Sequence, residues 1–225
     1  MLGKIAAIFL KDVTLEWRRR EALVTICLFS ILIVFIFRLN FGLDPTREET
    51  FRLLPGLLWV AFAFSGVWGC NRSFASEKEN GCMDAVILTP MDPGILYLGK
   101  VLANLLFILV AELVVVLVTF IWFNLPPKSL NGWLFLSIFL GTLGYVAVGT
   151  LFAAIAVNTR MREVMLPIFH FPVAVPVFIY AVGATSGSLR GQPVEEFSYE
   201  LQMLVSIGII FTVVSYMLFE FVTEE

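Results

Sequence analysis

The chain has 225 residues, of which 59% are hydrophobic and 15% charged, and its formal net charge is −3. Ordinary soluble domains carry about 25% charged residues, so this composition favours a membrane protein over a soluble enzyme. The negative net charge and the scarcity of basic clusters argue against a nucleic-acid partner. Cys27, Cys70 and Cys82 form no C-x-x-C pair, and we interpret them as small apolar side chains, not as metal or redox sites.

Residues 1–21 predict an amphipathic helix that lies in the membrane interface. Apolar side chains recur at helical spacing on one face, while Lys4, Lys11 and Arg18 lie on the other. The alternative is a plain basic flank before the first membrane span. The predicted apolar face comprises Ala6, Phe9, Leu10, Val13 and Trp17.

Six apolar stretches follow, and each is interpreted as a transmembrane helix. A helix needs about 20 apolar residues to cross a hydrocarbon core of about 30 Å. The first stretch reaches that length only by continuing to Leu43, with Arg38 snorkelling to the head groups. The predicted fold is an all-α membrane protein, with a single transmembrane domain over 1–225. The expected spans are 22–43, 53–71, 101–125, 131–157, 164–187 and 201–219.

The basic residues predict how these spans are oriented. With six spans both termini lie on one side of the membrane, and that side carries ten of the 15 lysines and arginines. The positive-inside rule then places both termini and the 72–100 loop in the cytoplasm.

The 72–100 loop is the cytoplasmic segment long enough to contact a partner. Its first part is typical of a helical extension of the second span, followed by a short helix over 82–88 and a turn at Pro93-Gly94. Six of its residues are candidates for contact with a partner protein, namely Glu77, Lys78, Glu79, Gly81, Asp84 and Pro90.

Residues 94–100 match the pattern G-x-x-x-x-G-K of a phosphate-binding loop. The next residue is Val101, where that motif needs Ser or Thr to hold Mg²⁺, and a turn precedes the segment instead of a buried strand. We interpret the match as coincidental. We therefore do not expect this chain itself to bind ATP, and no residue here is a catalytic candidate.

Three polar residues inside the predicted spans are candidates for a specific role. Glu112 lies near the middle of the third span, two helical turns from Asn104, where a carboxylate is costly in lipid and should face other helices or a water-filled cleft. The two residues form either a structural clamp between helices or part of a transport or proton-relay path. His170 lies among three prolines, where it is either a partner of freed backbone carbonyls or an axial ligand of haem iron. The residues indicate no metal cluster.

An interfacial helix, six spans and a charged loop after the second span resemble the membrane subunit of a type-2 ABC exporter. Segments 57–61, 72–81, 88–90 and 97–100 narrow the resemblance to the haem exporter B family of cytochrome c maturation. The similarity extends over essentially the whole chain. It implies a protein of a bacterial inner membrane that couples ATP hydrolysis to haem export, or to release of a haem-loaded chaperone.

The resemblance also implies a set of partners. They are a separate ABC ATPase subunit, a second membrane protein that handles haem, a small protein with a single membrane span, a periplasmic haem chaperone and membrane lipid. No resident cofactor is expected, and haem enters as a transported or complex-bound ligand. Three alternatives stay open: a permease for a drug or glycan, a structural assembly subunit, and a membrane enzyme that uses Glu112 and His170 as acid and base.

Overall fold

The computed structural model describes residues 2–19, 21–41, 48–79, 92–157, 159 and 162–223, and over these residues it consists of helices joined by turns. An amphipathic helix comes first and six longer helices follow. The elements are α1 (Leu2–Arg19), α2 (Glu21–Phe41), α3 (Glu48–Glu79), α5 (Pro93–Trp122), the short 3₁₀ helix η1 (Pro127–Ser129), α6 (Gly132–Val157), α7 (Arg162–Leu189) and α8 (Val194–Thr223).

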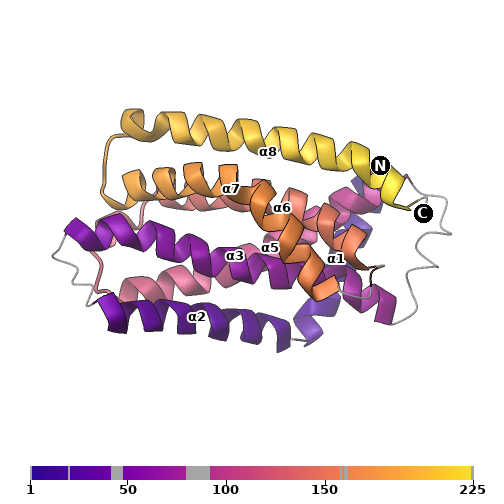
Figure 1. Ribbon diagram of the computed structural model, residues 1–225, viewed down its shortest axis with the longest axis horizontal. Coiled ribbons are helices and arrows are strands. Elements are labelled where there is room, and N and C mark those ends of the chain that lie inside the picture. The colour runs from indigo at the N-terminus through magenta and orange to yellow at the C-terminus, as the bar shows by residue number, and fades with distance from the viewer. Residues whose placement is uncertain are drawn as a thin grey trace.

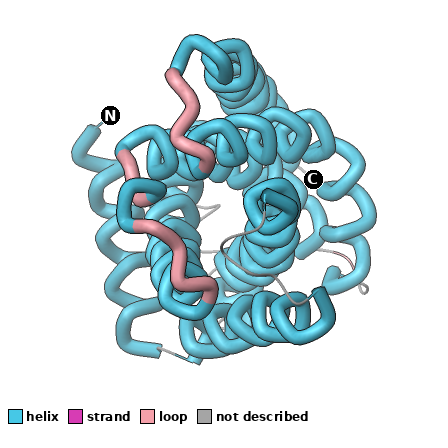
Figure 2. The backbone as a smooth tube through the Cα atoms, turned by 90° about the vertical axis from the view of Figure 1, so that its left-hand side faces the viewer, coloured by secondary structure: helices cyan, strands magenta, loops and turns pink. Residues whose placement is uncertain are grey.

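The six longer helices lie side by side along one axis and form a bundle (Figure 1). Both chain termini lie at one end of the bundle. Figure 2 looks at the opposite end, where loops join α5 to α6 and α7 to α8. Successive helices therefore cross the bundle in alternating directions, as expected for a chain that passes repeatedly through a membrane.

Five of these helices, α3, α5, α6, α7 and α8, are long and apolar enough to cross a membrane, and α2 contributes a shorter apolar stretch, Leu23–Leu39. The chain is thus a multi-pass helical membrane protein. At a rise of 1.5 Å per residue, the 32-residue α3 is about 48 Å long and the 30-residue α5 about 45 Å. Both exceed a hydrocarbon core of about 30 Å, so these two helices extend beyond it.

The start of α5 differs from the expected turn at Pro93-Gly94. Asp92 is instead the N-cap, and its side chain accepts a hydrogen bond of 2.8 Å from the backbone N–H of Gly94. Pro93 takes the first helical position, where its missing N–H costs nothing because that group has no partner within a helix. The helix therefore begins eight residues before the predicted span at 101–125.

The hub of the bundle is α6, which packs against α3, α5, α7 and α8. Of the most apolar stretch of α6, 72% of the residues are buried, whereas in the corresponding stretch of α8 only 17% are buried. Small residues let the helices approach closely. A Cβ on Gly141 would lie 2.3 Å from the Trp59 ring of α3, and the Trp59 indole N–H donates a 3.0 Å hydrogen bond to Thr185 of α7.

Helix α7 contains Pro167, Pro172 and Pro176, and prolines inside a helix commonly kink it. The helix is unbroken from Arg162 to Leu189 and bends in its middle (Figure 1). Proline removes one backbone hydrogen bond and strains the preceding turn, which bends a helix without ending it when neighbouring helices hold both halves.

Helix α1 packs against the bundle through its acidic side, and part of its predicted apolar face stays exposed. Leu10, from the predicted apolar face, is 60% exposed, whereas Asp12 and Glu16 are partly covered by α3 and α5. The inward face thus carries two carboxylates, and their partners are described below.

Candidate functional site

The residues flanking the 72–100 loop form the clearest charged cluster that the structure describes. Glu77, Lys78 and Glu79 end α3, and only their backbone is described. The predicted helix 82–88 and the candidate residues Gly81, Asp84 and Pro90 lie outside the described residues. The structure describes the base of this loop, where the last turns of α3 and the first turns of α5 lie next to α1.

Gly99 brings α1 against α5. A Cβ at this position would lie 2.7 Å from Cγ2 of Ile8, so only glycine leaves room for the Ile8 side chain. Asp12 lies one helical turn after Ile8, and Lys100 is the next residue after Gly99. The close approach therefore places a carboxylate of α1 opposite an ammonium of α5.

Lys100 is buried, with 1% of its side chain exposed, and its contacts reach two other helices. Its Nζ lies 3.0 Å from Oδ2 of Asp12 and donates a 3.1 Å hydrogen bond to the backbone carbonyl of Ser73. Its ammonium also lies 5.2 Å from the centre of the Phe74 ring, within cation–π range. The buried charge thus ties α5 to both α1 and α3.

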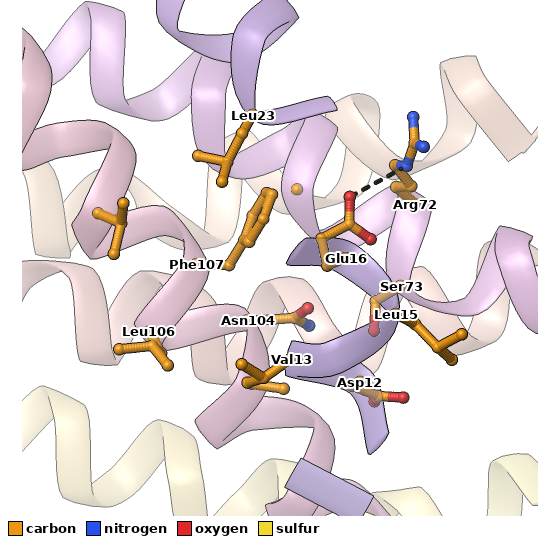
Figure 3. Close-up of a pocket in the computed structure, with 13 residues that line it drawn as sticks. Asp12, Val13, Leu15, Glu16, Leu23, Arg72, Ser73, Asn104, Leu106 and Phe107 are labelled. Carbon is orange, nitrogen blue, oxygen red and sulfur yellow. Dashed lines mark ion pairs between the residues drawn. The ribbon is translucent and has the colours of Figure 1, made fainter. Parts of the chain in front are cut away.

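A second ion pair lies beside the first. Nε of Arg72 in α3 lies 3.3 Å from Oε1 of Glu16 in α1, one turn after Asp12 (Figure 3). Both side chains are partly exposed, so this pair contributes less than the buried one. We call Asp12, Glu16, Arg72, Ser73 and Lys100 the loop-base cluster.

The cluster explains Lys100 without any phosphate ligand. The whole G-x-x-x-x-G-K segment is helical within α5, and no strand precedes it in the described part of the chain. A phosphate-binding loop needs free backbone N–H groups. Here the N–H groups of Gly94 and Ile95 bond to Asp92, and those that follow lie in the helix. The ammonium holds three helices together at the loop base.

Asn104 and Glu112 both contact α6. The amide Nδ2 of Asn104 donates a 3.1 Å hydrogen bond to Thr150, and Oγ1 of Thr142 donates a 2.8 Å bond to Oε2 of Glu112. Asn104 and Glu112 are 6% and 2% exposed. Each bonds separately to the hub helix, which is the geometry of an interhelical clamp.

His170 also bonds to α6. Its Nε2 lies 3.0 Å from the carbonyl oxygen of Tyr145, and its ring packs on the Tyr145 ring with centroids 4.1 Å apart. The carbonyl belongs to α6, not to the proline-rich helix that carries the histidine. A Cβ on Gly149 would lie 2.7 Å from the imidazole, so the ring is tightly enclosed. Among the described residues no group of three or more His, Cys, Asp or Glu side chains could hold a metal ion.

The loop-base cluster leaves a signal in the sequence that motif patterns miss. Lys100 lies within an apolar helix, and a buried ammonium requires a carboxylate partner. Asp12 and Glu16 fall one turn apart on α1, as a pair of partners should. Which basic residue each one meets depends on the docking of α1, and periodicity does not encode it.

Comparisons with known proteins point to a single family. A family model described as "CcmB protein" matches residues 3–223. A Pseudomonas aeruginosa protein named "Heme exporter protein B" is 28% identical over 212 residues, covering 94% of both chains. Proteins of the same name from Rhodobacter capsulatus and Escherichia coli K12 are 26% and 24% identical, covering 74% and 84% of this chain and 76% and 85% of theirs.

The buried ion pair predicts a large loss of stability when it is broken. Replacing Asp12 by Asn leaves the Lys100 ammonium without its carboxylate, at an expected cost of about 3–5 kcal/mol. Lys11 is a matched control: its Nζ lies 3.3 Å from the same Asp12 but is 43% exposed, so Lys11→Met should cost at most about 1 kcal/mol. Thermal unfolding of the purified protein in detergent measures both, and equal effects would contradict the assignment.

The Glu112 clamp predicts a difference between two substitutions. Glu112→Ala leaves the Thr142 hydroxyl without its acceptor, at about 1–3 kcal/mol, whereas Glu112→Gln keeps a carbonyl oxygen to accept the bond and should be mild. Thr142→Val should resemble Glu112→Ala. Thr119→Val is the control, because its hydroxyl bonds to Val115 of its own helix. Equal unfolding temperatures for the Ala and Gln variants would rule out this role.

Proposed function

Because the chain belongs to the CcmB protein family, we propose that it is the membrane subunit of an ABC transporter complex that serves cytochrome c maturation. It couples ATP hydrolysis by a separate ATPase subunit to haem export, or to release of a haem-loaded periplasmic chaperone. The observation that carries this proposal is the family match over residues 3–223, together with relatives named "Heme exporter protein B" that cover most of the chain.

In this proposal the chain crosses the membrane six times, in a type-2 permease arrangement. Helix α2 has 21 residues, which gives a length of about 31 Å and suffices for one crossing. It lies alongside α3 and α5 in the bundle (Figure 1), and packs against both. With α1 at the interface, six crossings put both termini on one side. The basic residues favour the cytoplasm of a bacterial inner membrane for that side.

In this proposal the 72–100 loop is the coupling element, and the loop-base cluster holds its base. Because α3 and α5 exceed the thickness of the hydrocarbon core, they carry the segment between them beyond it. The loop-base cluster fixes α3 and α5 to α1 about two helical turns from the ends that flank this segment. Because the segment is held at its base, a force that a partner applies to it moves whole helices. The acidic residues Glu77, Glu79 and Asp84 then meet the partner ATPase.

The other partners are a haem-handling membrane protein, a small single-span protein and the periplasmic chaperone. The exposed apolar side chains of α7 and α8, including Ile179, Ile209 and Met217, offer surface for lipid or for neighbouring membrane proteins of the complex. The contacts of His170 favour a mechanical role over a haem path, because Nε2 is engaged by Tyr145 and the ring is enclosed by α6.

The proposed topology predicts a labelling pattern. In a cysteine-free background, a cysteine at position 48, at the first turn of α3, should react with an impermeant maleimide in whole cells. A cysteine at position 92, at the start of α5, should react only after permeabilisation. The two positions lie at opposite ends of the bundle. Labelling of both after permeabilisation shows that both cysteines can react, so a difference in whole cells reports the side of the membrane. The reverse pattern would overturn the orientation.

The coupling role predicts the effect of reversing charge at the end of α3. The double variant Glu77→Lys/Glu79→Lys should reduce co-purification of the ATPase and the level of covalent c-type cytochromes, because it removes two carboxylates from the docking segment. Membrane abundance should be unchanged. Haem staining of membrane fractions and affinity purification measure these effects.

The matched control is Glu48→Lys/Glu49→Lys, which reverses two charges at the other end of the same helix. This control should retain the ATPase and the cytochromes. Normal ATPase association in the Glu77/Glu79 variant, or an equal loss in the control, would count against the proposed docking segment.

A further inference from the structure

A cleft of about 230 Å³ opens beside the loop-base cluster, between α1, α3, α5 and the start of α2. Figure 3 shows its walls, with Asp12 and Glu16 of α1, Arg72 of α3 and Asn104 of α5 around it. An engineered cavity of about 150 Å³ suffices to bind benzene. This cleft therefore has room for a ligand larger than a few water molecules.

The cleft changes from polar to apolar along α5. Its charged end carries Asp12, Glu16 and Arg72, and its other end, further along α5, is lined by the apolar residues Leu106, Phe107 and Val110. Asn104 and Val110 are six residues apart, or about 9 Å along the helix. Leu106 is 41% exposed, so the apolar end opens on the outer surface of the bundle. A ligand that fits this gradient has a polar head and an apolar chain.

The charges at the polar end select among amphiphiles. Two carboxylates and one guanidinium line it, and each carboxylate also faces a cation, Asp12 facing Lys100 and Glu16 facing Arg72. Because a carboxylate has several acceptor positions, both can accept further hydrogen bonds from a primary ammonium, while the guanidinium binds a phosphate. A head group with only negative charge competes with Asp12 and Glu16 for these cations and offers the carboxylates no donor of its own, which is unfavourable. The same argument disfavours haem, whose propionates are anionic.

We propose that this cleft binds one phospholipid whose head group carries both a phosphate and a primary ammonium, as in phosphatidylethanolamine. The ammonium lies near Asp12 and Glu16, the phosphate near Arg72, and an acyl chain along Leu106 and Val110. The bound lipid fills the space between α1 and the loop base. This binding is a property of the chain itself and does not depend on the transport role proposed above.

Native mass spectrometry of the purified full chain tests the proposal. Dioleoyl phosphatidylethanolamine, phosphatidylcholine and phosphatidylglycerol are added at equal concentrations, and the tightest single adduct should be phosphatidylethanolamine. Val110→Phe fills the apolar end and should weaken that adduct about tenfold or more. Val114→Phe is the control, because Val114 lies one turn further along α5 on the exposed surface and does not line the cleft.

A second variant changes the preference without filling the cleft. Glu16→Gln removes the carboxylate paired with Arg72, so phosphatidylglycerol should gain relative to phosphatidylethanolamine. Glycerophosphoethanolamine, which has the head group but no chains, should not compete. The proposal would be overturned if the three lipids were retained equally, or if Val110→Phe and Val114→Phe lost the adduct equally. It would also be overturned by an unchanged lipid preference in Glu16→Gln, or by competition from the chain-free head group.

Discussion

A lysine ammonium buried in an apolar bundle cannot remain without partners, because removing the charge from water costs several kcal/mol unless an opposite charge and hydrogen bonds replace the water. Lys100 imposes this constraint at the start of α5. It explains why α1 turns Asp12 inward and leaves Leu10 exposed, and why Gly99 must be small enough to admit Ile8. The carbonyl of Ser73 adds a hydrogen bond to the same ammonium. The position of α1 at the loop base therefore follows from one charge.

Deeper in the bundle hydrogen bonds between helices take the place of the ion pairs. Lipid tails are as apolar as leucine, so helices in a membrane gain little from burying apolar side chains and depend on close packing and hydrogen bonds. The polar bonds converge on α6. Besides the clamps to Asn104 and Glu112, the Tyr97 hydroxyl donates to the Ala147 carbonyl at 3.0 Å, and the Tyr145 hydroxyl to the Ala63 carbonyl at 2.6 Å. With His170, these bonds connect α3, α5 and α7 to one helix.

Hydropathy locates the helices well where a helix is apolar throughout. The apolar stretch 131–157 coincides with α6, Gly132–Val157, because nothing charged interrupts it. Hydropathy fails at the loop, where Pro93-Gly94 is compatible with either a turn or a helix start, and the cap by Asp92 decides between them. Likewise, Glu112 and Asn104 could be recognised as buried polar residues, but their separate partners on α6 depend on the register between two helices. Single-chain periodicity carries no information about that register.

The two sets of contacts meet on α5. Lys100 joins this helix to α1 and α3 at the loop base, and Asn104, one turn later, joins it to Thr150 of α6 while also lining the cleft. A displacement of the loop base that moves Lys100 must therefore strain the Asn104 bond or carry α6 along, since a packed helix shifts as a unit. Because α6 also contacts α3, α7 and α8, such a movement would reach these three helices as well. In the proposed coupling role, this connection would carry a movement of the loop base into the other helices of the bundle.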